Sequence, residues 1–329
     1  MLESLGFGVV AFMLGVYVML DGYDLGVALV SPLIARGDRE RAAAMRSIGP
    51  FWNGNEVWLI AGAGALFALF PAAYATAFSG FYLPLVVVLW LLMFRGIALE
   101  LRAQLDSPLW HDFWDAAFFL SSGLLIVLLG VALGNLIRGV PLDAAGYFQG
   151  TFAFLLNPYA LLIAAFGLAA LGQHGAAFAA MRIDGEPALR AARLMRGLWW
   201  AVLALYLLCG AATVVVRGVH LSVGAVAVPA VSLAALIWLR AASLRGRAPA
   251  AFAASSVFLA ALLAEAARAL YPYLIPAFPA GRGGLSIYDA APSRTALEVA
   301  LTVSIAGSAA ALVYGSVVWR RMAAKIRVE

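Results

Sequence analysis

The sequence predicts an all-α polytopic membrane protein that crosses the bilayer about nine times as helix bundles. Of its 329 residues, 64% are hydrophobic and only 12% are charged, whereas an ordinary soluble chain has about 25% charged residues. The apolar residues recur in runs of about 20, and a helix of that length spans the ~30 Å hydrocarbon core of a bilayer. A water-soluble globule is therefore excluded, and a single integral-membrane domain over residues 1–329 is expected.

Nine apolar segments define the expected membrane spans. They cover residues 5–34, 50–70, 79–100, 114–137, 157–180, 197–216, 223–243, 251–274 and 297–319. The uncharged stretch of residues 57–94 is too long for one membrane helix. Pro71 and the pair Ser79 and Gly80 interrupt it, so we expect two helices joined by a tight turn.

The basic residues set the expected orientation of the chain. Lys and Arg together number 22, and most of them fall in the connections on one side of the nine segments, which is typical of the cytoplasmic side. The exceptions on the other side are Arg138, Arg217, Arg282 and Arg294, while Arg268 lies within a segment. The N-terminus is then outside and the C-terminus cytoplasmic. Membrane topology also explains the net charge of +5, so no nucleic-acid partner is expected.

Four carboxylates are expected near the cytoplasmic side of the membrane. Asp21 and Asp24 lie three residues apart in the run DGYDLG, on one face of the first helix, while Glu56 begins the second segment and Glu100 ends the third. A charged side chain in mid-membrane costs ~2.5–3.5 kcal/mol, so each one requires a partner or a function. Two interpretations stay open. The first is a route for protons or cations, which we favour for the aspartates; the second is capping and pairing with a nearby cation such as Arg95.

The histidines and the cysteine argue against a cofactor held by this chain. A buried haem needs axial His or Met ligands on facing helices, and His174 is the one histidine well inside a segment. It is a weak candidate ligand, and a hydrogen-bonded packing role is favoured. Cys209 is the single cysteine, so no paired metal ligands are available and no metal site is predicted. Glu265 and Arg268, at positions i and i+3, are expected to form an ion pair.

Six motifs follow one another along nearly the whole chain. They are DGYDLG from Asp21, WNGNEVWL from Trp52, GALFALFPAAYATAFSGFY from Gly64, GVALGNLIRGVP from Gly130, QHGAAF from Gln173 and LSIYDAAPSRTAL from Leu285. Together with Arg95 and Arg102 they resemble subunit II of cytochrome bd-type quinol oxidases, including the cyanide-insensitive branch. The resemblance implies a two-subunit core in which subunit I holds b-type and d-type haem, oxidises quinol and reduces oxygen to water. Such a complex contributes to the proton motive force.

The resemblance also implies a role for particular residues of this chain. Subunit II supports subunit I without catalytic residues or haem ligands of its own, and lines part of a cytoplasmic proton route. Asp21, Asp24, Trp58 and Glu100 match positions tied to that route, and Glu56 is a further candidate. One position departs from the pattern, because residue 53 is Asn where relatives often have Asp. A path through residue 53 would then need water or a neighbouring carboxylate.

The expected surroundings follow from the same resemblance. They are the inner membrane of a bacterial or archaeal cell, its lipid, the haem-bearing subunit I, quinol as substrate of the complex, and, in some members, a structural quinone. Small single-helix accessory subunits are further partners that the family allows. A secondary transporter of a cation or small solute is the alternative, because nine spans and buried carboxylates are equally natural there.

Overall fold

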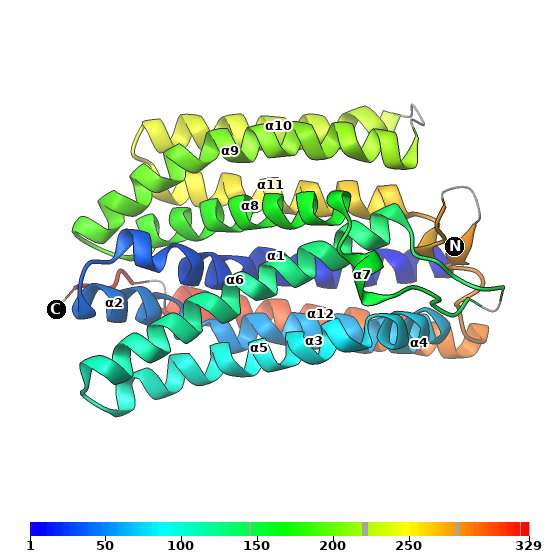
Figure 1. Cartoon of the computed structure of the whole chain (residues 1–329), viewed down its shortest axis with the longest axis horizontal. Helices are drawn as coiled ribbons and strands as arrows, with labels where there is room; N and C mark the ends of the chain where they lie inside the picture. Colours follow the sequence, from blue (N-terminus) through cyan, green and yellow to red (C-terminus); the bar gives the residue numbers. More distant parts are fainter. Residues whose placement is uncertain (145, 219–222, 280–282, 323, 329) are drawn as a thin grey trace.

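The chain forms an elongated bundle of long helices that run between two ends of the molecule (Figure 1). This computed structural model describes residues 1–144, 146–218, 223–279, 283–322 and 324–328. Within these residues, eight helices are long and apolar enough to cross a membrane. The expectation of an all-α polytopic membrane protein is therefore confirmed.

Each of the nine expected segments coincides with one long helix. These helices are α1 (Leu2–Ile34), α3 (Trp52–Leu69), α5 (Tyr82–Leu101), α6 (Pro108–Arg138), α8 (Pro158–Arg182), α9 (Glu186–Arg217), α10 (Val223–Leu244), α11 (Ala248–Leu270) and α12 (Arg294–Met322). Helix α3 is not among the eight candidate spans, because its first residues, WNGNE, are polar and shorten its apolar part. Nine crossings, with the N-terminus outside, stay a prediction.

Short elements connect the long helices at both ends. They are α2 (Asp38–Ile48), α4 (Pro71–Gly80), the 3-10 helix η1 (Arg102–Gln104), α7 (Phe152–Leu155), and the strands β1 (Tyr273–Pro276) and β2 (Gly284–Ser286), which pair antiparallel. The connection between α3 and α5 differs from the expected tight turn, because α4 fills it. Pro71 occupies the first turn of α4, where a missing N–H breaks no helical hydrogen bond, so this proline begins a helix.

Small residues allow the central helices to approach one another closely. A side-chain carbon at Gly26 of α1 would lie 2.1 Å from the carbonyl oxygen of Leu171 in α8, and one at Gly134 of α6 would lie 2.6 Å from Cα of Ala160. Only residues with little or no side chain fit such contacts. Helix α1 contacts α3, α6, α8, α11 and α12. Its DGYDLG run therefore lies in the interior of the bundle.

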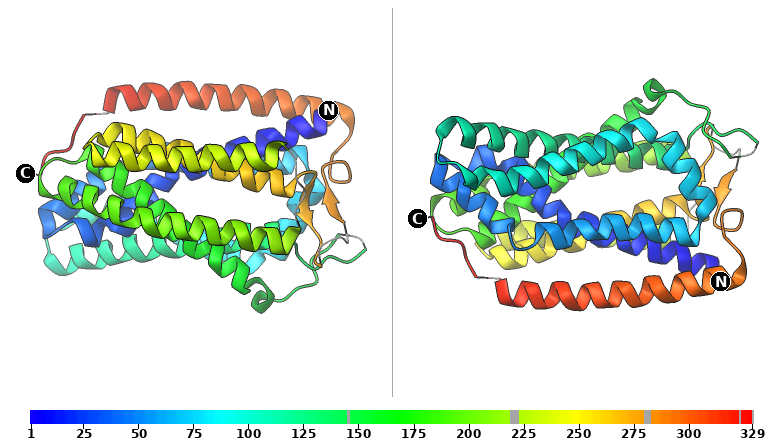
Figure 2. Two further views of the ribbon diagram at one scale, coloured as in Figure 1. Left: turned by 90° about the horizontal axis from the view of Figure 1, so that it is seen from above. Right: turned by 90° about the horizontal axis from the view of Figure 1, so that it is seen from below.

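The two ends of the molecule are formed by different segments of the chain. The N-terminus and the two long connections, residues 138–156 and 275–296, lie at one end, and the C-terminus lies at the other (Figures 1 and 2). Within these connections, residues 145 and 280–282, including Arg282, are outside the described residues. The two connections touch, because the N–H of Val140 donates to the carbonyl of Pro276 at 3.0 Å. Helix α12 lies at the periphery (Figure 2), with only 17% of its apolar window buried.

Candidate functional site

Helix α1 places two aspartates in the interior of the bundle. Asp21 and Asp24 are both 0% exposed. Their carboxylates are one helical turn apart and face α3 and α5, where their partners lie. Because ionised groups lose their hydration when buried, each of these carboxylates depends on charged or hydrogen-bonding neighbours.

Arg95 of α5 is the cation of this site. Its Nη1 lies 2.6 Å from Oδ1 of Asp21, and its Nη2 lies 3.6 Å from Oε2 of Glu56 at the start of α3. The guanidinium is completely buried, whereas the sequence placed Arg95 near the membrane surface. Asp21 and Glu56 thus share one cation, and Asp24 lies one helical turn from Asp21 with no cation within ion-pair distance among the described residues. Full ionisation of the three carboxylates would leave an excess of buried negative charge.

Asn55 of α3 joins the second aspartate to the cluster. Its Nδ2 donates to Oδ2 of Asp24 at 2.8 Å and to the hydroxyl of Tyr23 at 2.7 Å. Asn55 is buried, whereas Asn53, which attracted notice in the sequence, is exposed. Sequence reasoning missed Asn55. The signal was the buried face of α3, which continues from residue 55 at intervals of three and four through 58, 62, 65 and 69.

Several buried polar atoms of the cluster have no hydrogen-bond partner among the described residues. They are the Tyr17 hydroxyl, Oδ2 of Asp21, Oδ1 of Asp24, and Nε and Nη2 of Arg95. Most buried polar groups in proteins are paired with protein atoms or ordered water. Because these unpaired donors and acceptors lie close together, the cluster can bind water molecules, and protons can be exchanged through that water.

The remaining candidates of the proton route lie in different places. Trp58 is buried one helical turn after Asn55 and packs edge to face on Phe12, at 6.2 Å between ring centroids. Glu100 is exposed at the end of α5. The structure therefore brings Asp21, Asp24 and Glu56 together and leaves Glu100 outside this group.

His174 is fully engaged by its neighbours. Its Nδ1 lies 2.7 Å from the hydroxyl of Ser255, its Nε2 lies 3.0 Å from the carbonyl of Met19, and its ring stacks on Phe252. An axial bond to iron would require one of these hydrogen bonds to break. The packing role is thus the better account of this histidine, and in the residues that the structure describes no group of three His, Cys, Asp or Glu could hold a metal ion.

A second carboxylate site lies in α11. Glu265 was expected to pair with Arg268, but within the described ranges no ion pair forms between them. Instead, Oε1 of Glu265 accepts from the hydroxyl of Tyr206 in α9 at 3.0 Å and from the hydroxyl of Ser232 in α10. The expectation was wrong because the partners come from other helices, which local spacing does not reveal.

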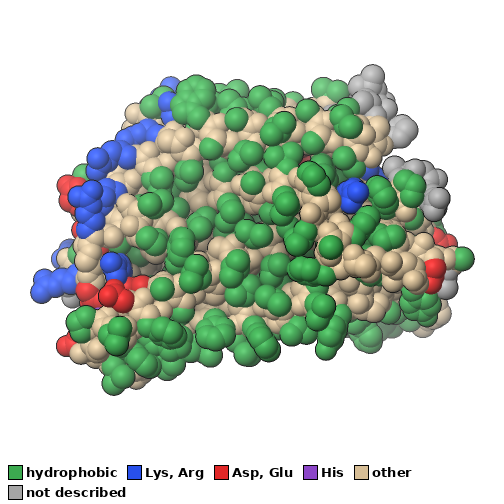
Figure 3. Space-filling model, in the orientation of Figure 1, with side chains coloured by type: hydrophobic (Ala, Val, Ile, Leu, Met, Phe, Trp, Pro, Cys, Tyr) green, Lys and Arg blue, Asp and Glu red, His purple; other side chains and the backbone are tan. Residues whose placement is uncertain are grey.

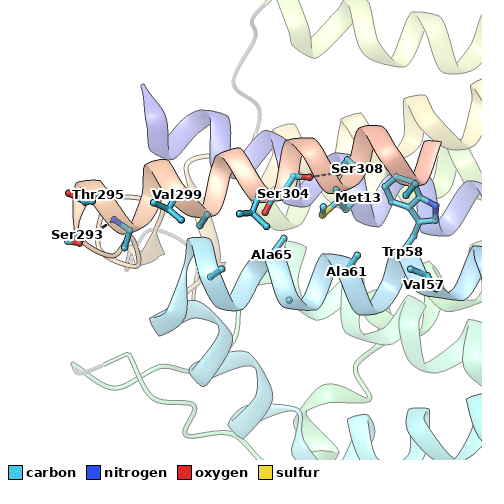
Figure 4. Close-up of a pocket in the computed structure, with 17 residues that line it drawn as sticks. Met13, Val57, Trp58, Ala61, Ala65, Ser293, Thr295, Val299, Ser304 and Ser308 are labelled. Atoms are coloured by element: carbon cyan, nitrogen blue, oxygen red, sulfur yellow. Dashed lines mark hydrogen bonds between the residues drawn. The ribbon is translucent and has the colours of Figure 1, made fainter. Parts of the chain in front are cut away.

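A groove runs between α3 and α12 on the outside of the bundle. Its volume is about 970 Å³. Figure 4 shows Val57, Ala61 and Ala65 of α3 facing Val299, Ser304 and Ser308 of α12 across it. Small residues line most of both walls: Ala61, Gly64, Ala65, Ala68, Ala296, Ala300, Ser304, Gly307, Ser308 and Ala311. The groove is therefore wide, apolar and able to take another helix closely.

The chain is similar to known proteins in both its sequence and its fold. The family model described as cytochrome bd terminal oxidase subunit II matches residues 2–322. Cytochrome bd-I ubiquinol oxidase subunit 2 of Escherichia coli strain K12 is 30% identical over 95% of this chain and 92% of that protein, and cytochrome bd ubiquinol oxidase subunit 2 of Bacillus subtilis is 34% identical over 73% and 71%. A chain of the bd oxidase structure from Geobacillus thermodenitrificans has the same fold, with a TM-score of 0.81, 18% identity, and coverage of 97% and 98%. The chain belongs to the family of cytochrome bd terminal oxidase subunit II.

Proposed function

We propose that this chain supports a haem-bearing subunit I and carries protons toward the haem at which oxygen is reduced to water. Family membership makes the chain one subunit of a quinol oxidase, an oxidoreductase complex of the bacterial inner membrane. The alternative of a secondary transporter is thereby set aside. The observation that carries the proton proposal is the group of three carboxylates beside the buried Arg95, in which Asp21 and Asp24 are fully buried and Glu56 is mostly buried.

The proposed route begins at Glu100 and continues through the cluster. Glu100 is exposed at the arginine-rich end, where it can collect protons from the cytoplasm, and Glu56 is the partly accessible member of the cluster, with 16% of its side chain exposed. From there a proton passes to Asp21 or Asp24 through water. Arg95 stabilises whichever carboxylate is ionised, so the proton can move among the three at little cost. Each electron that reaches a buried haem favours the uptake of one such proton.

The proposed docking face for subunit I consists of the groove and the outer face of α5. Trp90, Met93 and Ile97 follow one another on α5 at intervals of three and four, and all are exposed. Glu100 ends this row at the arginine-rich end, where a partner that covers the three apolar side chains leaves the carboxylate in contact with water. Because α12 forms one wall of the groove, the proposed docking face includes this last helix as well as α3 and α5.

The cofactors are proposed to lie in the partner. Family membership implies a haem-carrying complex, and the hydrogen bonds of His174 support b-type and d-type haem being held by subunit I. Quinol is the proposed substrate of the complex. A structural quinone and small accessory subunits stay predictions for it.

The test measures oxygen consumption per haem in membranes that contain both subunits. Asp24→Asn and Asp21→Asn keep the size of each side chain but remove the titratable group, so turnover should fall about 100-fold, the lower end of the range that a positioned proton-transfer group contributes. Haem spectra should stay normal. The matched control is Asp106→Asn, which removes an exposed carboxylate at the same end. Full activity of the double variant would show that the carboxylates are structural and that protons pass through subunit I.

A further inference from the structure

The arginine-rich end of the molecule has two parts with different charge balance. In the first part, formed by α2, η1 and the start of α6, acidic side chains lie among the arginines and neutralise two of them. Arg41 pairs with Asp112 at 2.8 Å, and Arg102 pairs with Asp38 and with Asp115, both at 2.6 Å. Partial desolvation would raise the pKa of Asp38, but the hydrogen bond and charge of Arg102 hold that pKa below its usual value.

The second part lies where α9 begins, α10 ends and α11 begins. Five arginines, which we call the arginine patch, gather there: Arg193, Arg196, Arg240, Arg245 and Arg247. In the described part of the chain none of them forms an ion pair, and the sequence has no Asp or Glu at all between residues 187 and 264. The nearby acids are engaged elsewhere, Asp184 with Lys325 and Glu186 with Arg190. Figure 3 shows blue side chains gathered over this corner, while red and blue mix in the other part.

One arginine of the patch is held in place by aromatic rings. The guanidinium of Arg240 lies 5.3 Å from the ring centroid of Trp199 and 5.5 Å from that of Trp200, and its Nη1 donates to the carbonyl of Arg196 at 3.0 Å. These contacts join α10 to α9 at one depth. They fix the positive charge at this corner without neutralising it.

The patch continues into an apolar surface toward the middle of α9. Arg193, Arg196 and Trp200 lie on one face of the helix, at i, i+3 and i+7, and Leu207 follows one heptad later. Trp200 is 61% exposed, and Leu244 at the end of α10 is 63% exposed. The order of basic, aromatic and aliphatic side chains matches the order of headgroup, interface and acyl chains in a bilayer.

We propose that the arginine patch binds an anionic phospholipid. The phosphate lies against Arg193, Arg196 and Arg245, and the acyl chains lie along Trp200 and Leu207. Arginine matches phosphate oxygens with two N–H groups at once, and basic pockets between membrane helices bind acidic headgroups. A soluble phosphate compound would use the arginines but leave the exposed apolar side chains uncovered, so a lipid fits both features.

The test uses the purified complex with both subunits and native mass spectrometry to count bound lipid. The probes are phosphatidylglycerol, which is anionic, and phosphatidylcholine, which has no net charge. The patch variant is Arg193→Gln with Arg245→Gln. The matched control is Arg36→Gln with Arg39→Gln, which removes two exposed arginines at the same end, near the acids of α2.

The expected result is a selective loss of the anionic lipid. Each surface arginine contributes about fivefold to binding of an acidic headgroup, so the patch variant should bind phosphatidylglycerol about 25-fold more weakly. Phosphatidylcholine binding and the control variant should change less than about twofold. Equal weakening in both double variants would overturn the proposal, because it would indicate general charge attraction. Unchanged phosphatidylglycerol binding in the patch variant would also overturn it and would leave an acidic segment of another subunit as the occupant.

Discussion

The molecule contains two carboxylate sites in its helix bundle, and they are built differently. Around α1, Asp21 and Glu56 share the guanidinium of Arg95, Asp24 lies beside them, and several polar atoms of this cluster have no hydrogen-bond partner among the described residues. At α11, a single carboxylate, Glu265, accepts from the hydroxyls of Tyr206 and Ser232, and no cation of the described residues pairs with it. Full ionisation would give the first site surplus negative charge, which is the basis of the proton transfer proposed there, while the second site is a local hydrogen-bonded group that joins three helices. Burial of a carboxylate alone therefore does not indicate proton transfer. The two sites differ because the first has several carboxylates beside one cation and polar atoms that are not yet hydrogen-bonded.

The largest effect is expected from the cation of the first site. Arg95→Leu leaves the carboxylates of Asp21 and Glu56 buried without a positive partner, and breaking a buried pair in this way costs about 3–5 kcal/mol. We expect the complex to be depleted from membranes, as measured by haem absorbance and by the amount of this chain. Arg95→Lys keeps the charge and should recover part of the protein. Normal assembly of the leucine variant would show that the carboxylates are already neutral and that the two sites are alike.

A smaller effect is expected from the amide that joins Asp24 to the cluster. Asn55→Ala removes the donor to Asp24 and to Tyr23, and an unsatisfied buried group of this kind costs about 1–3 kcal/mol. The thermal unfolding midpoint of the complex should fall, and oxygen consumption per haem should fall with it. Asn53→Ala on the exposed side of the same helix is the control and should change neither quantity. Equal behaviour of the two variants would remove Asn55 from the site.

Much of the fold could be predicted from the sequence, and less of the site. Among the described residues, apolar runs located the long helices, because the thickness of a bilayer sets a long and unambiguous signal. Helix α4 was missed because Pro71 and Gly80 are typical of turns as well as of helix ends. Asp21 and Asp24 were found because charge inside an apolar run is conspicuous. The burial of Arg95 and the partners of Glu265 could not be predicted from the sequence, because each depends on which helices pack together.

The third effect concerns the exposed end of the proposed route. Glu100→Gln removes one carboxylate at the surface, where water and other groups can still deliver protons to Glu56. We therefore expect oxygen consumption per haem to fall only about two- to threefold, much less than for Asp24→Asn. Activity should be measured across a range of buffer concentrations, since a mobile buffer can replace a surface proton collector. A loss as large as that of Asp24→Asn would place Glu100 within the obligatory path and not at its mouth.

The smallest effect is expected at the second carboxylate site, and it tests the comparison most directly. Glu265→Gln removes a titratable group but keeps an oxygen that can accept from both Tyr206 and Ser232. If Glu265 only joins α9, α10 and α11, stability should change by less than about 0.5 kcal/mol, as for a substitution that preserves its contacts. Oxygen consumption per haem should then be unchanged.

Glu265→Leu supplies the matching control, because it removes the acceptor as well as the charge. The two hydroxyls then lose the carboxylate and keep only the backbone carbonyls of Pro229 and Val228, each at 3.4 Å. We therefore expect about 1 kcal/mol of destabilisation, seen as a lower unfolding midpoint. Loss of turnover in the glutamine variant, with a normal unfolding midpoint, would mean that Glu265 must change its protonation state during turnover. The molecule would then have two proton-exchanging sites, and shared charge would no longer distinguish a working carboxylate from a structural one.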